Sequence, residues 1–207
     1  MDFIEKLDAL MPDYLTDENK NRLREGLRQF TNESIISKNY TDFYSTTQYD
    51  FFLQGDLIRQ LRFPVFDFKK GNYSKKYFDA LVVSNTCDID KNNNQKIPKE
   101  VLLAKAIPLD EYILDLKKIN VEKIDEKIIQ IKKQFYSNLL YLPPTKNSKE
   151  YIVLLDDICQ ISRQELNNLM DDIPNNRIDV LDHFGYYLFV FKLSYHLCRL
   201  PEEHYRN

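Results

Sequence analysis

Glycine is scarce in this chain: only four occur among 207 residues, at positions 26, 55, 71 and 185. Glycine-rich loops that bind nucleotide phosphates need two or three glycines within a few residues, because the backbone must approach the ligand closely. No two of these four lie that close together. Their spacing therefore excludes the P-loop and the dinucleotide-binding fingerprint.

A surplus of positive charge is also missing, because 29 Lys and Arg face 32 Asp and Glu, for a net charge of -3. Proteins that coat DNA regardless of its sequence depend on many cations that release counterions from the phosphates. We therefore expect no such DNA-coating function. A local basic groove remains compatible with this composition.

Cysteines are few and unpaired in sequence, since Cys87, Cys159 and Cys198 are odd in number and form no C-x-x-C pair. This usage is typical of a reducing compartment and argues against a disulfide framework. The first residues lack the basic-then-apolar pattern of a signal peptide, and charged residues interrupt the most apolar segment, 180–200. We expect a cytoplasmic protein with no membrane span, no metal and no cofactor.

The centre of the chain combines a short apolar run with a polar cluster. Leu81, Val82 and Val83 form a continuous run that predicts a strand buried on both faces. Five small polar residues follow at 84–88, and such residues favour a turn over further strand. We name this segment the 84–88 rim. Its candidate ligand-binding side chains are Ser84, Thr86, Cys87 and Asp88.

Patterning elsewhere predicts short strands in the middle and helices at both ends. We expect strands at 57–66, 101–108, 139–142 and 151–155, one inserted helix at 121–138, a helix capped by Ser162 and a closing helix at 178–200. The class is α+β, and strands this short favour a small barrel. The expected regions are an N-terminal helical extension and connector (1–48), a barrel (49–162) and C-terminal helices packed on it (163–207).

Three segments of the middle third resemble the MazF/PemK family of SH3-like barrels. They are Gln-Gly-Asp-Leu at 54–57, Ala-Leu-Val-Val-Ser-Asn at 80–85 and Val-Leu-Leu-Ala-Lys-Ala-Ile at 101–107. The chain is more closely similar to a larger, uncharacterised group of prokaryotic barrel proteins, through Ser-Asn-Thr-Cys-Asp-Ile at 84–89, Tyr-Leu-Pro-Pro at 141–144 and His-Leu-Cys-Arg at 196–199. This resemblance implies a small SH3-like β-barrel with N-terminal helices, one inserted helix and a long C-terminal helix.

The resemblance further implies metal-independent cleavage of single-stranded RNA, by an Arg just before the Pro of the central strand and a Thr at the end of the next strand. Here Phe78-Asp79 stands in place of Arg-Pro, and Pro108 stands in place of the Thr. A carboxylate at that position would repel phosphate. The family mechanism is therefore expected to be absent, unless Arg59, Arg62, Lys75 or Lys76 supplies the cation.

The Cys87-Asp88 pair has a catalytic and an ordinary interpretation. A thiol beside a histidine could act as a nucleophile if its pKa were lowered. The interpretation that we favour is a buried thiol and a carboxylate that binds turn amides. Cys87, His196 and Cys198 could also supply soft metal ligands, but two residues apart on a helix do not share a face.

Three functions stay open. The first is a MazF/PemK-like barrel that lacks the ribonuclease residues and docks a protein partner in a prokaryotic phage-defence or toxin–antitoxin system. The second is a divergent RNA endonuclease that uses the 84–88 rim with Arg59 or Arg62. The third is a small-molecule or metal sensor, and the oligomeric state stays open in each.

These hypotheses make different structural demands. Arg59 or Arg62 beside Cys87 and Asp88 in an open basic groove would favour the nuclease. A filled rim together with an exposed apolar helical face would favour the docking module. A guanidinium and a proton carrier together over a cleft of the sheet would argue against a purely docking role.

Overall fold

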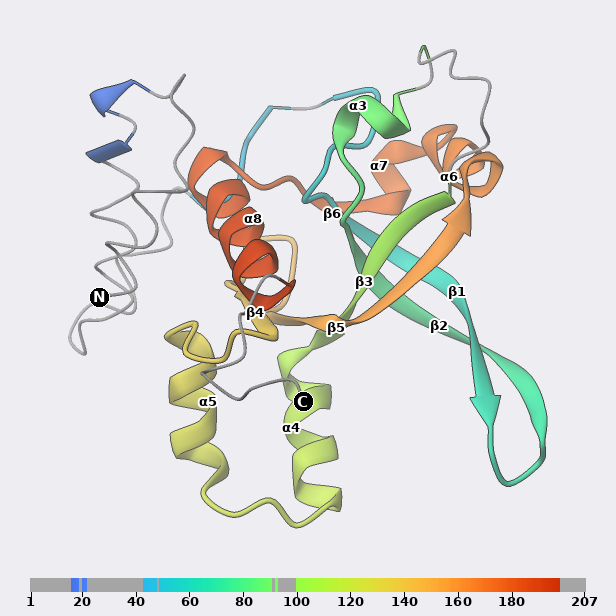
Figure 1. Cartoon of the computed structure of the whole chain (residues 1–207), viewed down its shortest axis with the longest axis vertical. Helices are drawn as coiled ribbons and strands as arrows, with labels where there is room; N and C mark the ends of the chain where they lie inside the picture. Colours follow the sequence, from blue (N-terminus) through green and yellow to red (C-terminus); the bar gives the residue numbers. More distant parts are fainter. Residues whose placement is uncertain are drawn as a thin grey trace, which may run out of the picture.

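A single antiparallel sheet organises the molecule (Figure 1). The computed structural model describes residues 16–18, 20–21, 43–47, 49–90, 92 and 100–197. The sheet has six strands in the order β4-β5-β3-β2-β1-β6. They are β1 (Leu57–Asp67), β2 (Asn72–Val82), β3 (Glu100–Pro108), β4 (Leu139–Leu142), β5 (Tyr151–Ser162) and β6 (Arg177–Asp179). The predicted α+β class is confirmed, and the strongly twisted sheet is compatible with a small barrel-like fold.

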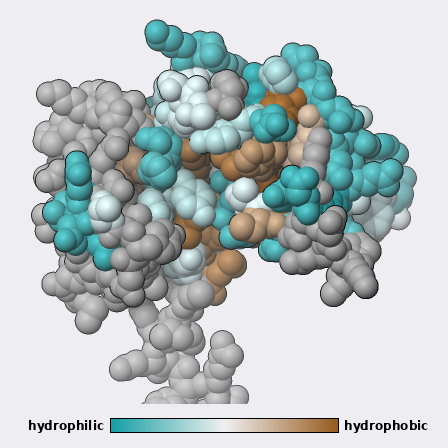
Figure 2. Space-filling view, turned by 90° about the horizontal axis from the view of Figure 1, so that it is seen from above, coloured by the Kyte–Doolittle hydropathy of each residue, from teal (hydrophilic) through white to brown (hydrophobic). Residues whose placement is uncertain are grey.

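Helices cover both faces of this sheet. They are α3 (Thr86–Ile89), α4 (Leu109–Lys118), α5 (Ile124–Lys132), α6 (Arg163–Met170), α7 (Ile173–Asn176) and α8 (His183–Leu197). One buried cluster joins α8 to the face that carries Leu57, Leu81 and Val153. A second cluster joins α6 and α7 to the face that carries Ile58, Val82 and Leu103. Seen from above, apolar residues are visible mainly in the hollow of the surface, within a hydrophilic outer margin (Figure 2).

The central strand is buried on both faces, as its sequence predicts. Leu81 and Val83 belong to the cluster beneath α8, whereas Ala80 and Val82 belong to the opposite one. Alternate residues of a strand point to opposite faces, so a continuous apolar run is needed where both faces are covered. The strand itself starts earlier, at Asn72, after a turn in which Gly71 takes a positive φ of 64°.

The inserted segment contains two helices where one was predicted. α4 begins directly after Pro108, and α5 is confined to Ile124–Lys132 within the expected 121–138 span. Acidic residues in the first turn of α4 and lysines in its last turn complement the helix dipole, which is a pattern that could have predicted it. α5 ends early because Gln134 adopts a positive φ of 59°. Helices α4 and α5 pack against β4 and β5 through one buried apolar cluster, which contains Leu109, Ile131, Leu139, Tyr141 and Ile152.

The predicted start of the closing helix is wrong. Residues 177–179 form β6, which pairs with Leu57 and Ile58 of β1, and α8 begins only at His183. Arg177 explains the difference, because its buried side chain is paired with Asp56 and holds this segment in the extended conformation along β1. Arg199 and Leu200, placed in the same helix by the sequence, lie outside the described residues.

Little of the N-terminal extension falls within the described residues. Asp17, Glu18, Lys20 and Asn21 are helical, and the Lys20 amide donates to the Thr16 carbonyl at 2.9 Å. The rest of the two predicted N-terminal helices lies outside the described residues. No helix in the described part of the chain combines the length and the apolar character that are needed to cross a bilayer.

Candidate functional site

The 84–88 rim is occupied by local hydrogen bonds. The Ser84 hydroxyl accepts from the Leu102 amide at 2.8 Å, and the Thr86 hydroxyl accepts from the Gln54 amide at 3.0 Å. The side-chain Oδ1 of Asn85 accepts from the Cys87 amide and caps the short helix α3. These side chains therefore fasten β2 to its neighbours, which is a structural role.

Cys87 and Asp88 complete the rim, and neither belongs to a metal-binding cluster within the described ranges. Cys87 is exposed, so the interpretation of it as a buried thiol is wrong. Tyr186 of α8 donates to Gln54 beside the rim, and His196 lies ten residues later, roughly 15 Å along the helix. No group of three or more His, Cys, Asp or Glu within the described ranges is arranged to hold a metal ion, and Cys198 lies outside those ranges.

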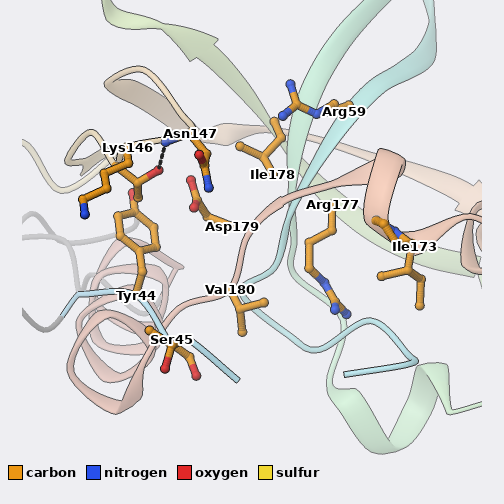
Figure 3. A pocket seen from close by; sticks show the side chains of 13 residues that line it. Tyr44, Ser45, Arg59, Lys146, Asn147, Ile173, Arg177, Ile178, Asp179 and Val180 are labelled. Carbon is orange, nitrogen blue, oxygen red and sulfur yellow. Dashed lines mark hydrogen bonds between the residues drawn. The ribbon is translucent and has the colours of Figure 1, made fainter. Parts of the chain in front are cut away.

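A polar pocket of about 650 Å³ lies elsewhere on the molecule, between β1, β6 and the turn that precedes β5. It is lined by residues 44–46, 59, 145–147, 173–174 and 177–180. In Figure 3, Arg59 lies at one side of this pocket and Lys146 and Tyr44 lie at the other, with Asp179 between them. Arg177 points away toward the 49–51 backbone, to which it donates two hydrogen bonds.

Arg59 reaches the pocket because β1 is irregular at this point. The pairing of β1 with β2 shifts register between Ile58 and Leu61, and Gln60 adopts a positive φ of 46°. The Gln60 amide donates to one Asp79 carboxylate oxygen, and the Tyr151 hydroxyl donates to the other, each at 2.8 Å. Asp79 therefore holds the bulge, and a bulge redirects the side chain that it carries.

Tyr151 is a hydrogen-bond donor at this site and not a base. Burial raises the pKa of its phenol well above the ordinary value, and the hydrogen bond to Asp79 raises it further, while the Arg59 charge acts in the opposite direction. The phenol stays protonated throughout the physiological range. Asp79 accepts from Gln60 and Tyr151 and is not among the residues that line the pocket, so its carboxylate holds the bulge and does not contact a ligand there.

Asp179 is the carboxylic acid among the residues that line the pocket. Burial raises the pKa of its carboxyl, while hydrogen bonds from the Ser148 and Thr145 side chains and the charge of Arg59 act to lower it. One of its carboxylate oxygens, Oδ2, is buried without a hydrogen-bond partner within the described part of the chain. A carboxyl in such a setting can exchange a proton at a higher pH than an ordinary aspartate.

The Arg177–Asp56 pair positions β6, and with it Asp179. Arg177 donates through Nε to Asp56 Oδ2 at 2.8 Å, and its Nη1 donates to the Tyr49 carbonyl at 2.8 Å. Burial raises the pKa of Asp56 to about 6, although Arg177 opposes this shift. Both side chains are almost fully buried, so this pair is part of the scaffold and not a site for a ligand.

Of the residues predicted for the site, only Arg59 lines the pocket. Arg62 is exposed further along β1 opposite Tyr77, and Ser84 lies five residues beyond Asp79 on the chain, roughly 15 Å away along an extended strand. Asp79, Tyr151 and Asp179 were not among the predicted site residues. The sequence predicts strand around Asp79 and Tyr151 but helix around Asp179. No local pattern shows that Asp79 and Tyr151, 72 residues apart, are joined by a hydrogen bond.

The chain matches no protein-family model, and no curated protein matches it either.

Proposed function

We propose that the protein cleaves single-stranded RNA without a metal, with Arg59 and Asp179 as the catalytic pair of the polar pocket. The observation that carries this proposal is that an exposed guanidinium and a half-buried carboxyl with a raised pKa line the same pocket. RNA cleavage by internal attack needs a cation on the phosphate and a group that takes a proton. The pocket provides both.

The proposed step uses the neighbouring 2′-hydroxyl of the RNA as the nucleophile. Arg59 binds the scissile phosphate and stabilises its developing charge, while Asp179 takes the proton from the 2′-hydroxyl. The 2′ oxygen then bonds to phosphorus, the bond from phosphorus to the 5′ oxygen breaks, and water protonates the leaving oxygen. The products are a 2′,3′-cyclic phosphate and a 5′-hydroxyl end.

The resemblance to MazF/PemK barrels supports this proposal in part. It implies the same reaction, but its cation stands in the central strand at the position of Phe78, and Asp79 stands where the family has the following Pro. In this protein the cation comes instead from β1, at the bulge that Asp79 holds. The proposal therefore replaces the family arrangement with one that uses a different strand.

Arg59→Gln tests the pocket directly. We expect wild-type protein to cut a mixed RNA pool in the presence of EDTA and to leave cyclic phosphate ends, and Arg59→Gln to lower the rate by a hundredfold or more, as expected for loss of a charge-stabilising donor. The measurement is the rate of product formation on a denaturing gel. Lys118→Gln on α4, which removes another exposed cation outside the pocket, serves as the control.

An absence of cleavage by wild-type protein, or equal cleavage by Arg59→Gln, would contradict the proposal. Inhibition by EDTA would contradict the metal-independent step alone. A folded state of each variant is checked by its circular dichroism spectrum.

A second candidate function is the docking module, which one observation favours. The inserted helices and the turns that follow them leave large apolar side chains exposed: Leu114, Ile119, Ile129 and Phe135. Ser84 and Thr86 of the 84–88 rim are also engaged in local hydrogen bonds, which agrees with this hypothesis, whereas Cys87 is exposed. Co-expression with the product of an adjacent gene tests it, since Leu114→Glu should break a specific complex and Lys70→Gln, in the turn between β1 and β2, should preserve it.

A further inference from the structure

The β1–β2 hairpin extends outward from the rest of the sheet (Figure 1). Residues 62–77, which we name the arm, include the outer halves of both strands and the turn that joins them. Most side chains in this part of the hairpin are exposed, whereas Ile58, Leu61 and Ala80 at its base are buried. An extended two-stranded ribbon gains little stability on its own, so an exposed arm of this length needs another explanation.

The arm is strongly basic although the whole chain is acidic. It carries Arg62, Lys69, Lys70, Lys75 and Lys76 against the single acid Asp67, a net charge of +4 in a chain whose net charge is -3. All five cations are exposed. Such a local concentration of positive charge complements a polyanion, because each cation that binds a phosphate releases condensed counterions.

Four exposed aromatic residues are interleaved with these cations. Phe68, Tyr73 and Tyr77 are 89%, 73% and 64% exposed, and Phe66 is 38% exposed. The Phe66 ring packs edge-on against Phe68 at 5.0 Å and against Tyr73 at 5.1 Å between centroids. Exposed aromatic rings among cations are the usual surface for stacking unpaired bases.

The strand register places two of these cations and three of these rings on one face of the arm, whereas Lys76 lies on the other face, opposite Phe63. Arg62 pairs with Tyr77, Pro64 with Lys75, and Phe66 with Tyr73, and residues that are directly opposite share a face. The regular alternation of β2 puts Tyr73, Lys75 and Tyr77 on the same face as Asp79. That face therefore continues inward to the bulge that carries Arg59.

We propose that the arm is a stacking platform for unpaired bases of the RNA strand whose phosphate enters the Arg59 pocket. This inference rests on the proposed function and assigns to the substrate a second contact surface outside the pocket. A paired duplex cannot use such a surface, because its base faces are already stacked and only its phosphates remain accessible. The arm thus selects single strands, with cations that follow the backbone and rings that receive the bases.

The test measures binding apart from cleavage. The probe is a labelled 2′-O-methyl oligouridylate of about twelve nucleotides, a length within the usual site size, which cannot undergo attack by its blocked 2′ oxygen. Its affinity is measured by fluorescence anisotropy. We expect Tyr73→Leu/Tyr77→Leu to bind it about tenfold more weakly or worse, at unchanged net charge. The matched control is Phe135→Leu, which removes an equally exposed ring (73%) outside the arm.

A second pair of variants tests the cations. Arg62→Gln/Lys75→Gln should weaken binding and make the slope of log affinity against log salt shallower by about one to two, since each phosphate contact contributes roughly 0.7 for a single strand. Lys118→Gln should leave the slope unchanged. The same probe annealed to its complement should bind at least tenfold more weakly than the free strand.

Three results would overturn the inference: an unchanged affinity for Tyr73→Leu/Tyr77→Leu, equal binding of duplex and single strand, or equal competition by an acidic peptide. The outcome is separable from that of the pocket. Binding that depends on the arm without any cleavage would refute the Arg59–Asp179 reaction and leave the arm intact. Cleavage of RNA by the wild type, together with normal binding of the probe by the arm variants, would refute the role of the arm and leave the Arg59–Asp179 reaction standing.

Discussion

Asp79 and Asp179, on the same face of the sheet, have different roles because their hydrogen-bond partners differ. Asp79 accepts hydrogen bonds at both oxygens, from the Gln60 amide and the Tyr151 hydroxyl, and therefore acts as a fastener. Asp179 lies on the short edge strand β6, with one buried oxygen that lacks a partner within the described residues. Burial raises the pKa of Asp179, so this carboxyl is the one suited to take a proton.

The pH profile of cleavage tests this assignment. A base acts when deprotonated, so kcat/KM for RNA should rise with pH through the raised pKa of Asp179, above the range near 4 that is ordinary for aspartate. Asp179→Asn should lower kcat/KM by about a hundredfold or more and remove this rising limb. Asp171→Asn, at an exposed position after α6, is the control and should keep the wild-type profile. A rising limb that persists in Asp179→Asn would refute the role of this residue.

At the scale of elements, α8 approaches the 43–45 segment closely enough to require a glycine. A Cβ atom added at Gly185 would lie 2.5 Å from the Phe43 carbonyl oxygen and 3.2 Å from the Phe43 ring. The Asp182 amide donates to the same carbonyl at 3.0 Å, so that oxygen has little freedom to move. Because residues 44–46 also line the pocket, this contact sets one wall of the candidate site.

Gly185→Ala should therefore destabilise the protein, although alanine favours a helix by about 1 kcal/mol over glycine. We expect the overlap with Phe43 to outweigh that gain and to lower the free energy of unfolding by about 1–3 kcal/mol. The measurement is the midpoint of urea unfolding. Ser194→Ala in the same helix should change the stability by less than about 0.5 kcal/mol. A Gly185→Ala variant as stable as the wild type would contradict this prediction, because it would show that the 43–45 segment moves to accommodate the added methyl group.

At the scale of the whole molecule, one buried lysine joins the closing helix to the inserted helices. The Lys192 side chain on α8 is 3% exposed and donates to the carbonyls of Gln134 at 2.9 Å and Tyr136 at 2.8 Å. Gln134 in turn exchanges two hydrogen bonds with the backbone of Tyr141 in β4. Burial lowers the pKa of Lys192 to about 7 from an ordinary 10.5.

This lysine should make the global stability depend on pH. Between pH 7 and 10.5 the unfolded chain binds a proton that the folded protein lacks, so the free energy of unfolding should increase with pH in that window. We expect a gain of about 1–2 kcal/mol from pH 7 to 9, given that one proton contributes at most about 1.4 kcal/mol per pH unit. Lys192→Met should lose this gain, as measured by urea unfolding at each pH.

Other groups that titrate in this range are shared by both proteins, so the difference between the two curves isolates Lys192. Cys159, whose pKa burial raises to about 11, is one such group. Parallel curves for wild type and Lys192→Met would show that the lysine remains charged when buried.

The sequence pattern was sufficient to predict those elements that are stabilised by interactions between residues close together in the chain. The apolar run at 81–83 predicts a strand covered on both faces, and Ser162 caps α6, as predicted, by accepting from the Glu165 amide at 3.1 Å. Composition and patterning also predict the α+β class. Each of these depends on backbone sterics, burial periodicity or a hydrogen bond within a few residues, which a sequence records directly.

The tertiary structure alone decided where the candidate site lies. β6 is a strand and not the first turn of a helix because Arg177 pairs with Asp56, 121 residues away in sequence. Arg59 lines the pocket because Asp79 and Tyr151 hold a bulge in β1. Such long-range pairings are selected by the burial and charge of the assembled fold, so the residues that the pocket unites carry no common pattern in the sequence.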